Sequence, residues 1–239
     1  MSHRLRWALI ALILLAWGLR LYRLEAQSLW YDEAVTADVV QLGLERLTRW
    51  TADDIQPPFY YYLLAGWVGL AGSGEWALRF PSALFGLLTV PLAYALGRRL
   101  FARGGDWGRW AAFLGAAFAC LSPLYIYYAQ EARMYALLTA LGLLMAAFLV
   151  DWLHTPLRQE QRRDRWLAMI AVSIAAVYTH YYAFFLILAF AVYFLAVWSR
   201  RRPRLVGIEA LIALISIGVA YFPWLPFVVN RYQADASYW

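Results

Sequence analysis

The feature that most constrains this chain is a series of long apolar runs separated by short segments rich in arginine. Each run holds at most one acidic or basic residue, and the runs occupy residues 78–96, 110–127, 134–153, 166–198 and 206–229. A helix needs about 20 apolar residues to cross a bilayer. Hydrophobic residues make up 64% of the 239, whereas soluble domains are about half apolar. The chain is therefore predicted to be an all-α integral membrane protein, a polytopic helical bundle.

The positions of the arginines predict the topology. All 21 basic residues are arginine, and the formal net charge is +6. Suppose that residues 166–198 cross twice, with a turn near His180, and that the short run 59–71 lies on the outer surface. The arginine-rich segments then share one side: the N-terminus, 98–109, 158–165 and 200–204. Cytoplasmic loops carry such an excess. We therefore expect about seven transmembrane helices in the cytoplasmic (inner) membrane, with a cytoplasmic N-terminus.

The longest polar interval is predicted to be a large external loop with juxtamembrane interfacial helices. From Ala34 to Trp50 apolar residues recur at helical spacing, which is typical of an amphipathic helix lying on the membrane surface. The pair Pro57–Pro58 ends this part, and the run 59–71 that follows is too short to span. The chain thus divides as one transmembrane domain, residues 1–239, with a first span at 7–24, the external loop at 25–77 and the remaining spans at 78–229.

Composition and motifs argue against several other classes. The arginines lie in short loops between apolar runs, where orientation signals belong, so no nucleic-acid partner is expected. The single cysteine, Cys120, lies inside an apolar run. It provides neither a disulfide framework nor a zinc site, and we expect a small buried hydrophobe. No Gly-rich phosphate loop or Ser-His-Asp arrangement can be built from the sequence. We therefore expect neither a cofactor nor a metal ion.

Two adjacent carboxylates, Asp32 and Glu33, open the polar interval just after the first apolar run. One interpretation is structural, because acidic residues are favoured at a helix N-terminus. The other is catalytic, with one carboxylate acting as a general base, which must be partly desolvated and within hydrogen-bond reach of the group it deprotonates. A mouth between helices at the membrane surface meets both conditions.

A second candidate site is the segment 130–135, Gln-Glu-Ala-Arg-Met-Tyr, at the predicted outer end of a span. A structural hypothesis pairs Glu131 with Arg133 at the membrane interface. A functional hypothesis makes Arg133 a clamp for an anionic phosphate, because its guanidinium suits that task. Under the functional hypothesis, Gln130, Glu131, Arg133 and Tyr135 would contact substrate. Arginine so close to lipid rarely lacks a partner, which favours function.

Three further residues are weaker candidates for substrate binding. His180 lies among tyrosines, where it is either a hydrogen-bonded interface residue or a ligand or proton-transfer group. Asp54 and Gln56, together with Asp53, precede Pro57–Pro58. They either shape a pocket or belong to an ordinary polar turn.

Taken in order, five motifs resemble the bacterial relatives of protein O-mannosyltransferases and of the lipid A aminoarabinose transferases, a superfamily of glycosyltransferase family 39 type. The motifs are Ser28–Ala34, Gln56–Tyr61, Leu78–Gly86, Gln130–Tyr135 and Thr179–Tyr181. These relatives are polytopic glycosyltransferases of the GT-C fold that use polyprenyl-phosphate-linked sugars. The resemblance implies the layout already expected, a first span and an external loop followed by further spans.

The resemblance also implies a mechanism at the outer face of the membrane. Asp32 would be the base that deprotonates an acceptor hydroxyl, with Glu33 beside it, and transfer would invert the anomeric centre. The acceptor would be a protein, lipid or glycan of the cell envelope. Where many relatives have His, or Glu-Lys, before the paired prolines, this chain has Ile55–Gln56, which argues against a metal site. Relatives are commonly about twice as long, so an N-terminal fragment or a short form is expected.

Two other classes are kept open. A non-catalytic flippase or binding subunit for lipid-linked sugars would line its path with polar groups through the whole membrane depth. This sequence instead gathers its acidic groups at one predicted face, which favours an enzyme. A membrane scaffold without chemistry would tolerate any replacement of Asp32.

Overall fold

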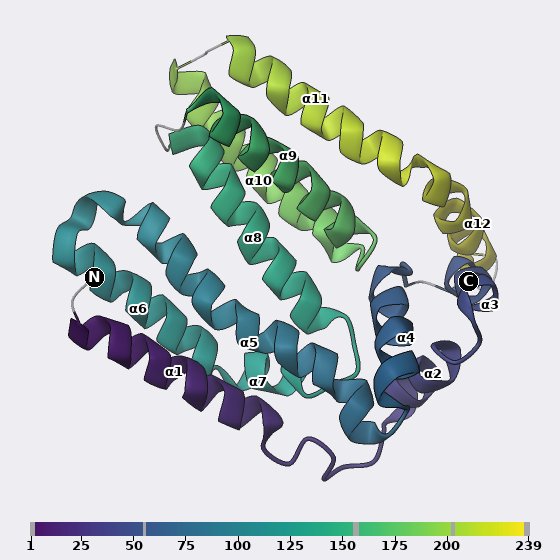
Figure 1. Cartoon of the computed structure of the whole chain (residues 1–239). Coiled ribbons are helices and arrows are strands. Elements are labelled where there is room, and N and C mark those ends of the chain that lie inside the picture. Colours follow the sequence, from purple (N-terminus) through teal and green to yellow (C-terminus); the bar gives the residue numbers. More distant parts are fainter. Residues whose placement is uncertain (1–2, 55, 155–157, 202–203, 237–239) are drawn as a thin grey trace.

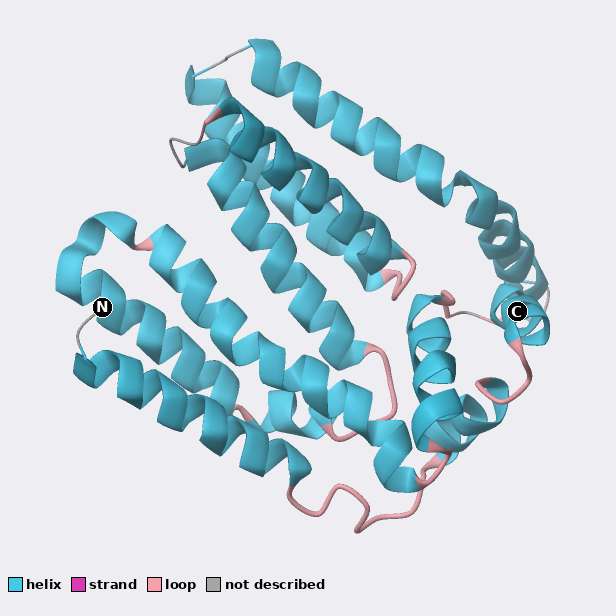
Figure 2. Cartoon of the chain, viewed as in Figure 1, coloured by secondary structure: helices cyan, strands magenta, loops and turns pink. Residues whose placement is uncertain are grey.

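The computed structural model describes residues 3–54, 56–154, 158–201 and 204–236, and within them all regular secondary structure is helical (Figures 1 and 2). The α-helices are α1 (His3–Leu21), α2 (Tyr31–Val39), α3 (Leu44–Asp53), α4 (Phe59–Ala71), α5 (Glu75–Leu100), α6 (Gly105–Leu121), α7 (Pro123–Ala129), α8 (Tyr135–His154), α9 (Gln159–Val177), α10 (Tyr182–Arg201), α11 (Arg204–Tyr221) and α12 (Leu225–Ala236). Two short 3₁₀ turns, η1 (Ala102–Gly104) and η2 (Phe222–Trp224), complete the order.

Seven long helices run along a common direction and form the bundle: α1, α5, α6, α8, α9, α10 and α11 (Figure 1). They occupy the predicted spans, so the prediction of an all-α membrane bundle is confirmed. Within the described part of the chain, four helices are long and apolar enough to cross a membrane: Glu75–Leu100, Tyr135–His154, Tyr182–Arg200 and Arg204–Arg231. The bent pair formed by α6 and α7 would be a fifth. That α1 and α9, which carry arginines near their ends, also cross the bilayer remains a prediction.

Helix α5 lies at the centre of the bundle and packs against α1, α4, α6, α7 and α8. Small residues allow this close approach. A Cβ atom on Gly97 would lie only 2.7 Å from the Cα of Ala112 on α6, and Ala112 and Ala116 are fully buried. Lipid tails are as apolar as leucine, so helices in a bilayer associate through tight packing of small residues. Glycine and alanine therefore determine which helices α5 contacts.

Two predicted elements are broken where we expected continuity. The amphipathic helix predicted over 34–50 is two helices, α2 and α3, because the chain turns at Gly43 with φ +79°, a conformation that favours glycine. The run 110–127 bends by 54° between α6 and α7. Pro123 lacks an N–H and disfavours the α conformation in the residue before it, and Ser122 is accordingly extended (ψ 120°).

One end of the bundle carries the helices predicted to be interfacial, and the other carries arginine-rich turns. Helices α2, α3 and α4 lie beyond the N-terminal end of α5, beside the loop that leads into α8 (Figure 1). The backbone N–H of Phe59 donates to the carbonyl of Tyr178, 2.9 Å away, and so ties α4 to the turn between α9 and α10. The candidate site residues lie at this end.

Candidate functional site

Asp32 and Arg133, predicted from segments a hundred residues apart, lie in contact. Asp32 is in the first turn of α2, and Arg133 is in the loop between α7 and α8. A terminal guanidinium nitrogen of Arg133 lies 3.5 Å from Asp32 Oδ2, and the exposed fractions of the two side chains are 7% and 35%. The same guanidinium lies 3.4 Å from the Thr36 hydroxyl and 6.0 Å from the Tyr135 ring centre. The pair joins a nearly buried cation to a carboxylate that solutes can reach.

Glu33 lies on the inner side of the same helix turn and is bound to Arg79 of α5. The two side chains form a two-pronged ion pair with N···O distances of 2.9 and 2.7 Å, and Glu33 is only 1% exposed. The backbone N–H of Ala132 donates to Glu33 Oε1 at 2.8 Å. Arg79 also donates to the carbonyls of Leu24 and Gln27, at 2.9 and 2.8 Å. This cluster joins the first external loop, α5 and the 130–134 loop.

Arg79 is a residue of this cluster that was not predicted from the sequence. Its signal was a single arginine near the start of an otherwise uncharged apolar run, at residues 78–96. Buried arginine at a span needs a fixed partner, but which carboxylate it meets cannot be read from spacing.

Gln130, predicted to contact substrate, instead caps α1. Its amide nitrogen donates to the carbonyls of Leu19, Arg20 and Tyr22, at 3.2, 3.3 and 2.9 Å. The last carbonyls of a helix have no partner within the helix. Gln130 satisfies them and fixes the start of the 130–134 loop against the end of α1.

Glu131 points into the protein. It is 6% exposed, and burial raises the pKa of its carboxyl, an effect that the Tyr127 hydroxyl partly offsets. Its Oε2 is buried with no hydrogen-bond partner among the described residues. Ion pairs in the described part of the chain join Arg133 to Asp32, not to Glu131. The Glu131–Arg133 ion pair of the structural hypothesis is therefore not formed among the described residues.

His180 occupies the turn between α9 and α10 with a defined tautomer. The backbone N–H of Tyr182 donates to Nδ1 at 3.0 Å, so in the neutral ring the proton resides on Nε2. Burial, and then the charge of Arg133, lower the pKa of the imidazole. The ring centre lies 5.8 Å from that of Tyr135. His180 is thus a neutral N–H donor close to Arg133.

Asp54 and Arg133 both act electrostatically on Tyr61, and Gln56 follows Asp54 in the segment before Pro57. The Tyr61 side chain is 1% exposed; burial raises its pKa to about 12, while Arg133 lowers it and Asp54 raises it. Gln56 Oε1 is buried without a partner in the described part of the chain. Asp53 is the exposed last residue of α3, and Ile55 lies outside the described residues.

A groove of about 690 Å³ begins beside Tyr135, which contacts both Arg133 and His180. Tyr128 and Tyr182 also line it, and its walls come from α5, α7 and α8. Within the described residues, no three His, Cys, Asp or Glu side chains group as metal ligands would. At this end the structure therefore provides an open carboxylate, a buried cation and a neutral imidazole.

Comparison with known proteins relates this arrangement to a family. Residues 55–227 match the family model of dolichyl-phosphate-mannose-protein mannosyltransferase. Among solved structures, ArnT from Cupriavidus metallidurans in the apo state superposes with a TM-score of 0.69 at 20% identity, covering 96% of this chain and 43% of that protein. The same protein bound to undecaprenyl phosphate gives a TM-score of 0.64 at 21% identity, covering 97% and 42%.

These matches confirm the resemblance inferred from the five motifs. At such identities the likeness to ArnT shows a shared GT-C-type membrane fold. The chain spans less than half of that protein's length. Comparison with curated protein sequences gives no match.

Proposed function

The chain belongs to the dolichyl-phosphate-mannose-protein mannosyltransferase family, and on that premise we propose that it transfers a sugar from a polyprenyl-phosphate donor to an acceptor hydroxyl. The observation that carries the proposal is the contact between Asp32, which is 35% exposed, and Arg133, which is 7% exposed. In the proposal, this contact sets the base beside the cation that would bind the donor phosphate. The end of the bundle that holds them would face away from the cytoplasm, with the N-terminus inside.

In this proposal Asp32 is the general base. Its carboxylate takes the proton of the acceptor hydroxyl as the acceptor oxygen bonds to the anomeric carbon. The bond from that carbon to the phosphate oxygen breaks, and the configuration inverts. The bonding electrons leave with the lipid phosphate, whose growing negative charge Arg133 stabilises. Asp32 and its contact with Arg133 lie where a base must be, partly desolvated and open to solutes.

For Glu33, predicted to be catalytic beside Asp32, we propose a positioning role. Both of its oxygens are bound, to Arg79 and to the Ala132 N–H, so neither is available to a substrate proton. We assign Glu33 and Arg79 as positioning residues. They hold α2 and the 130–134 loop at fixed places on α5 and so set the distance between Asp32 and Arg133.

The remaining site residues support the donor and the acceptor. His180 Nε2–H would donate to the donor phosphate, because the imidazole is neutral and lies near Arg133. Tyr135 would contact the donor beside the groove. Glu131 and Gln130 would act by holding the loop, while Asp54 and the unpartnered Gln56 Oε1 would meet the acceptor.

The alternative is a non-catalytic flippase or binding subunit for lipid-linked sugars, on the same scaffold. The charged residues near Asp32 gather at one end of the bundle, whereas a flippase needs polar groups along the path. This difference favours an enzyme.

The decisive experiment compares Asp32→Asn with the parent chain in proteoliposomes that contain undecaprenyl-phosphate-linked hexose or aminopentose. We expect turnover to fall by roughly 100-fold or more, while binding of undecaprenyl phosphate is retained. Asp38→Asn is the matched control, because Asp38 is an exposed carboxylate on the same helix. A parent chain that binds the donor without turnover would favour the binding subunit. An Asp32→Asn variant as active as the parent chain would show that Asp32 is not the general base.

A further inference from the structure

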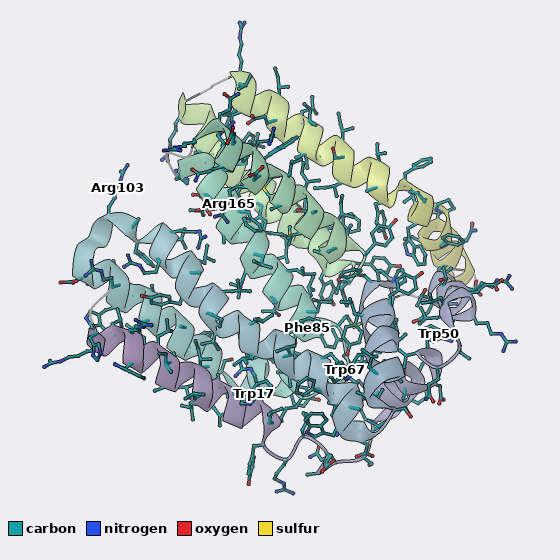
Figure 3. All side chains as sticks on the ribbon, viewed as in Figure 1. Trp17, Trp50, Trp67, Phe85, Arg103 and Arg165 are labelled. Carbon is teal, nitrogen blue, oxygen red and sulfur yellow. The ribbon has the colours of Figure 1, made fainter. Side chains whose placement is uncertain are left out.

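The end of the bundle opposite Asp32 contains a large open cleft. It lies between the α5–α6 turn on one side and α8, α9 and α10 on the other. Figure 3 shows Arg103 on the α5–α6 turn and Arg165 near the start of α9, on opposite sides of this opening. None of the residues that line this cleft is part of the proposed transfer site.

A buried carboxylate orients two of the arginines in this cleft. Asp151 is 6% exposed. Arg99 Nε donates to its Oδ1 at 2.8 Å, and Arg165 Nε lies 3.8 Å from its Oδ2. Arginine loses less conformational freedom on binding an anion when its guanidinium is already held. Arg99 is therefore held by a hydrogen bond, while Arg165 lies near the same carboxylate and stays 43% exposed in the cleft.

The other two arginines have no carboxylate partner. Arg98 and Arg103 line the same cleft, and in the described part of the chain neither lies within ion-pair distance of an acidic side chain. Four arginines against one aspartate give the lining a formal charge of +3. Orientation of a membrane protein requires only charge in the loop. Membrane orientation alone does not require the arginines to line a cleft around a buried aspartate.

Aromatic side chains border the cleft, as they do where proteins meet lipid headgroups. Trp107 is 68% exposed and Tyr193 38%, and both line the opening. Tyr193 is fixed by a 2.8 Å hydrogen bond to His154. Tryptophan and tyrosine concentrate at the headgroup level of a bilayer. The cleft thus combines clustered arginines with an aromatic rim.

We infer that this cleft binds the phosphate headgroup of an anionic phospholipid from the leaflet at the arginine-rich end. Clustered arginines beside membrane spans attract such lipids. A neighbouring cleft near the start of α9 lacks the same surplus, because Arg162 forms an ion pair with Glu209 there. Of these two clefts, the α5–α6 cleft carries the larger excess of positive charge.

Native mass spectrometry of the purified full chain in detergent tests the inference, with dioleoylphosphatidylglycerol as ligand and dioleoylphosphatidylcholine as the comparison lipid. The test variant is Arg98→Gln with Arg103→Gln. The matched control is Arg109→Gln with Arg163→Gln, which removes equal charge from the same end outside this cleft. We expect the test variant to lose about 30-fold in phosphatidylglycerol affinity, roughly fivefold per arginine. The control should change less than twofold.

Two outcomes would overturn the inference. Equal losses in both double variants would mean diffuse attraction without a site. Full displacement by inorganic phosphate at the same concentration as the lipid would mean a soluble anion is bound. An unchanged helical circular dichroism spectrum and unfolding midpoint show that each variant is folded. Because the variants lie far from Asp32, failure here leaves the proposed transfer function untouched.

Discussion

Two neighbouring residues, Asp32 and Glu33, form ion pairs of opposite kinds. Glu33 and Arg79 are closed from solvent, with side-chain exposures of 1% and 6% and a 2.7 Å contact. Asp32 and Arg133 are joined at 3.5 Å, and the carboxylate is 35% exposed. A buried pair whose donors and acceptors are satisfied is structural, and it costs much to break. An open pair with a spare carboxylate oxygen can exchange its partner for a substrate.

The 130–134 loop is the element that the two pairs share. Its Ala132 N–H binds Glu33 and its Arg133 binds Asp32. The closed pair therefore determines where the open pair lies.

The largest effect is expected from Arg79→Met. It would leave Glu33 buried without its cation, and removing one partner of a buried pair costs about 3–5 kcal/mol. The free energy of unfolding in mixed micelles, titrated with sodium dodecyl sulfate, measures the loss. Arg49→Met is the control, because Arg49 and Glu45 form an exposed pair of the kind worth less than about 1 kcal/mol. Equal losses of unfolding free energy in the two variants would show that the buried Glu33–Arg79 pair stabilises the fold no more than an exposed pair does.

Arg133→Ala is expected to act on binding more than on stability. Without its guanidinium, affinity for undecaprenyl phosphate should fall by about 10- to 100-fold, since a charge-assisted hydrogen bond is worth about 1.5–3 kcal/mol. Arg133→Lys should recover only part of the affinity, because lysine keeps the positive charge but lacks the planar guanidinium that can donate two hydrogen bonds to one phosphate. Isothermal titration in detergent measures both. Unchanged affinity in the alanine variant would refute the phosphate role.

Gln130→Ala should loosen the loop from α1. Losing the amide that caps three carbonyls should destabilise the fold by about 1 kcal/mol, the usual net worth of a neutral hydrogen bond. Turnover should fall while affinity for undecaprenyl phosphate stays within about twofold. A variant with lower stability and fully normal turnover would show that the position of the loop does not govern the chemistry. Thermal unfolding and initial rates are the measurements.

The smallest effect concerns pH. Burial raises the pKa of Glu131 in the folded chain, so the folded state holds this proton more tightly than the unfolded state. Stability is then greatest below the unfolded pKa and falls as pH rises through the folded pKa. Glu131→Gln should flatten this slope and raise stability at neutral pH. Unfolding titrations between pH 4 and 8 would test the sign, and an unchanged slope would mean that Glu131 is ionised at no cost.

Much of the site could be predicted because the bilayer sorts residues by depth. Topology alone placed Asp32, Glu131, Arg133 and His180 at one predicted face, and in the structure they lie at one end of the bundle. The break at Gly43 was missed, because apolar spacing continues across it and only the backbone conformation reveals the turn. The contact of the Gln130 amide with the end of α1 could not be predicted, because spacing along the chain does not show which helix end a side chain reaches.

The sequence by itself determined the class of protein, the places of the long helices and the family. These depend on the length and apolarity of runs, which a chain of 239 residues carries in its local order. Only the tertiary structure decided which of two adjacent carboxylates is enclosed and which is open. Successive residues on a helix point about 100° apart, so the neighbours of α2, not the motif, assigned Glu33 to Arg79 and Asp32 to the solvent-facing mouth.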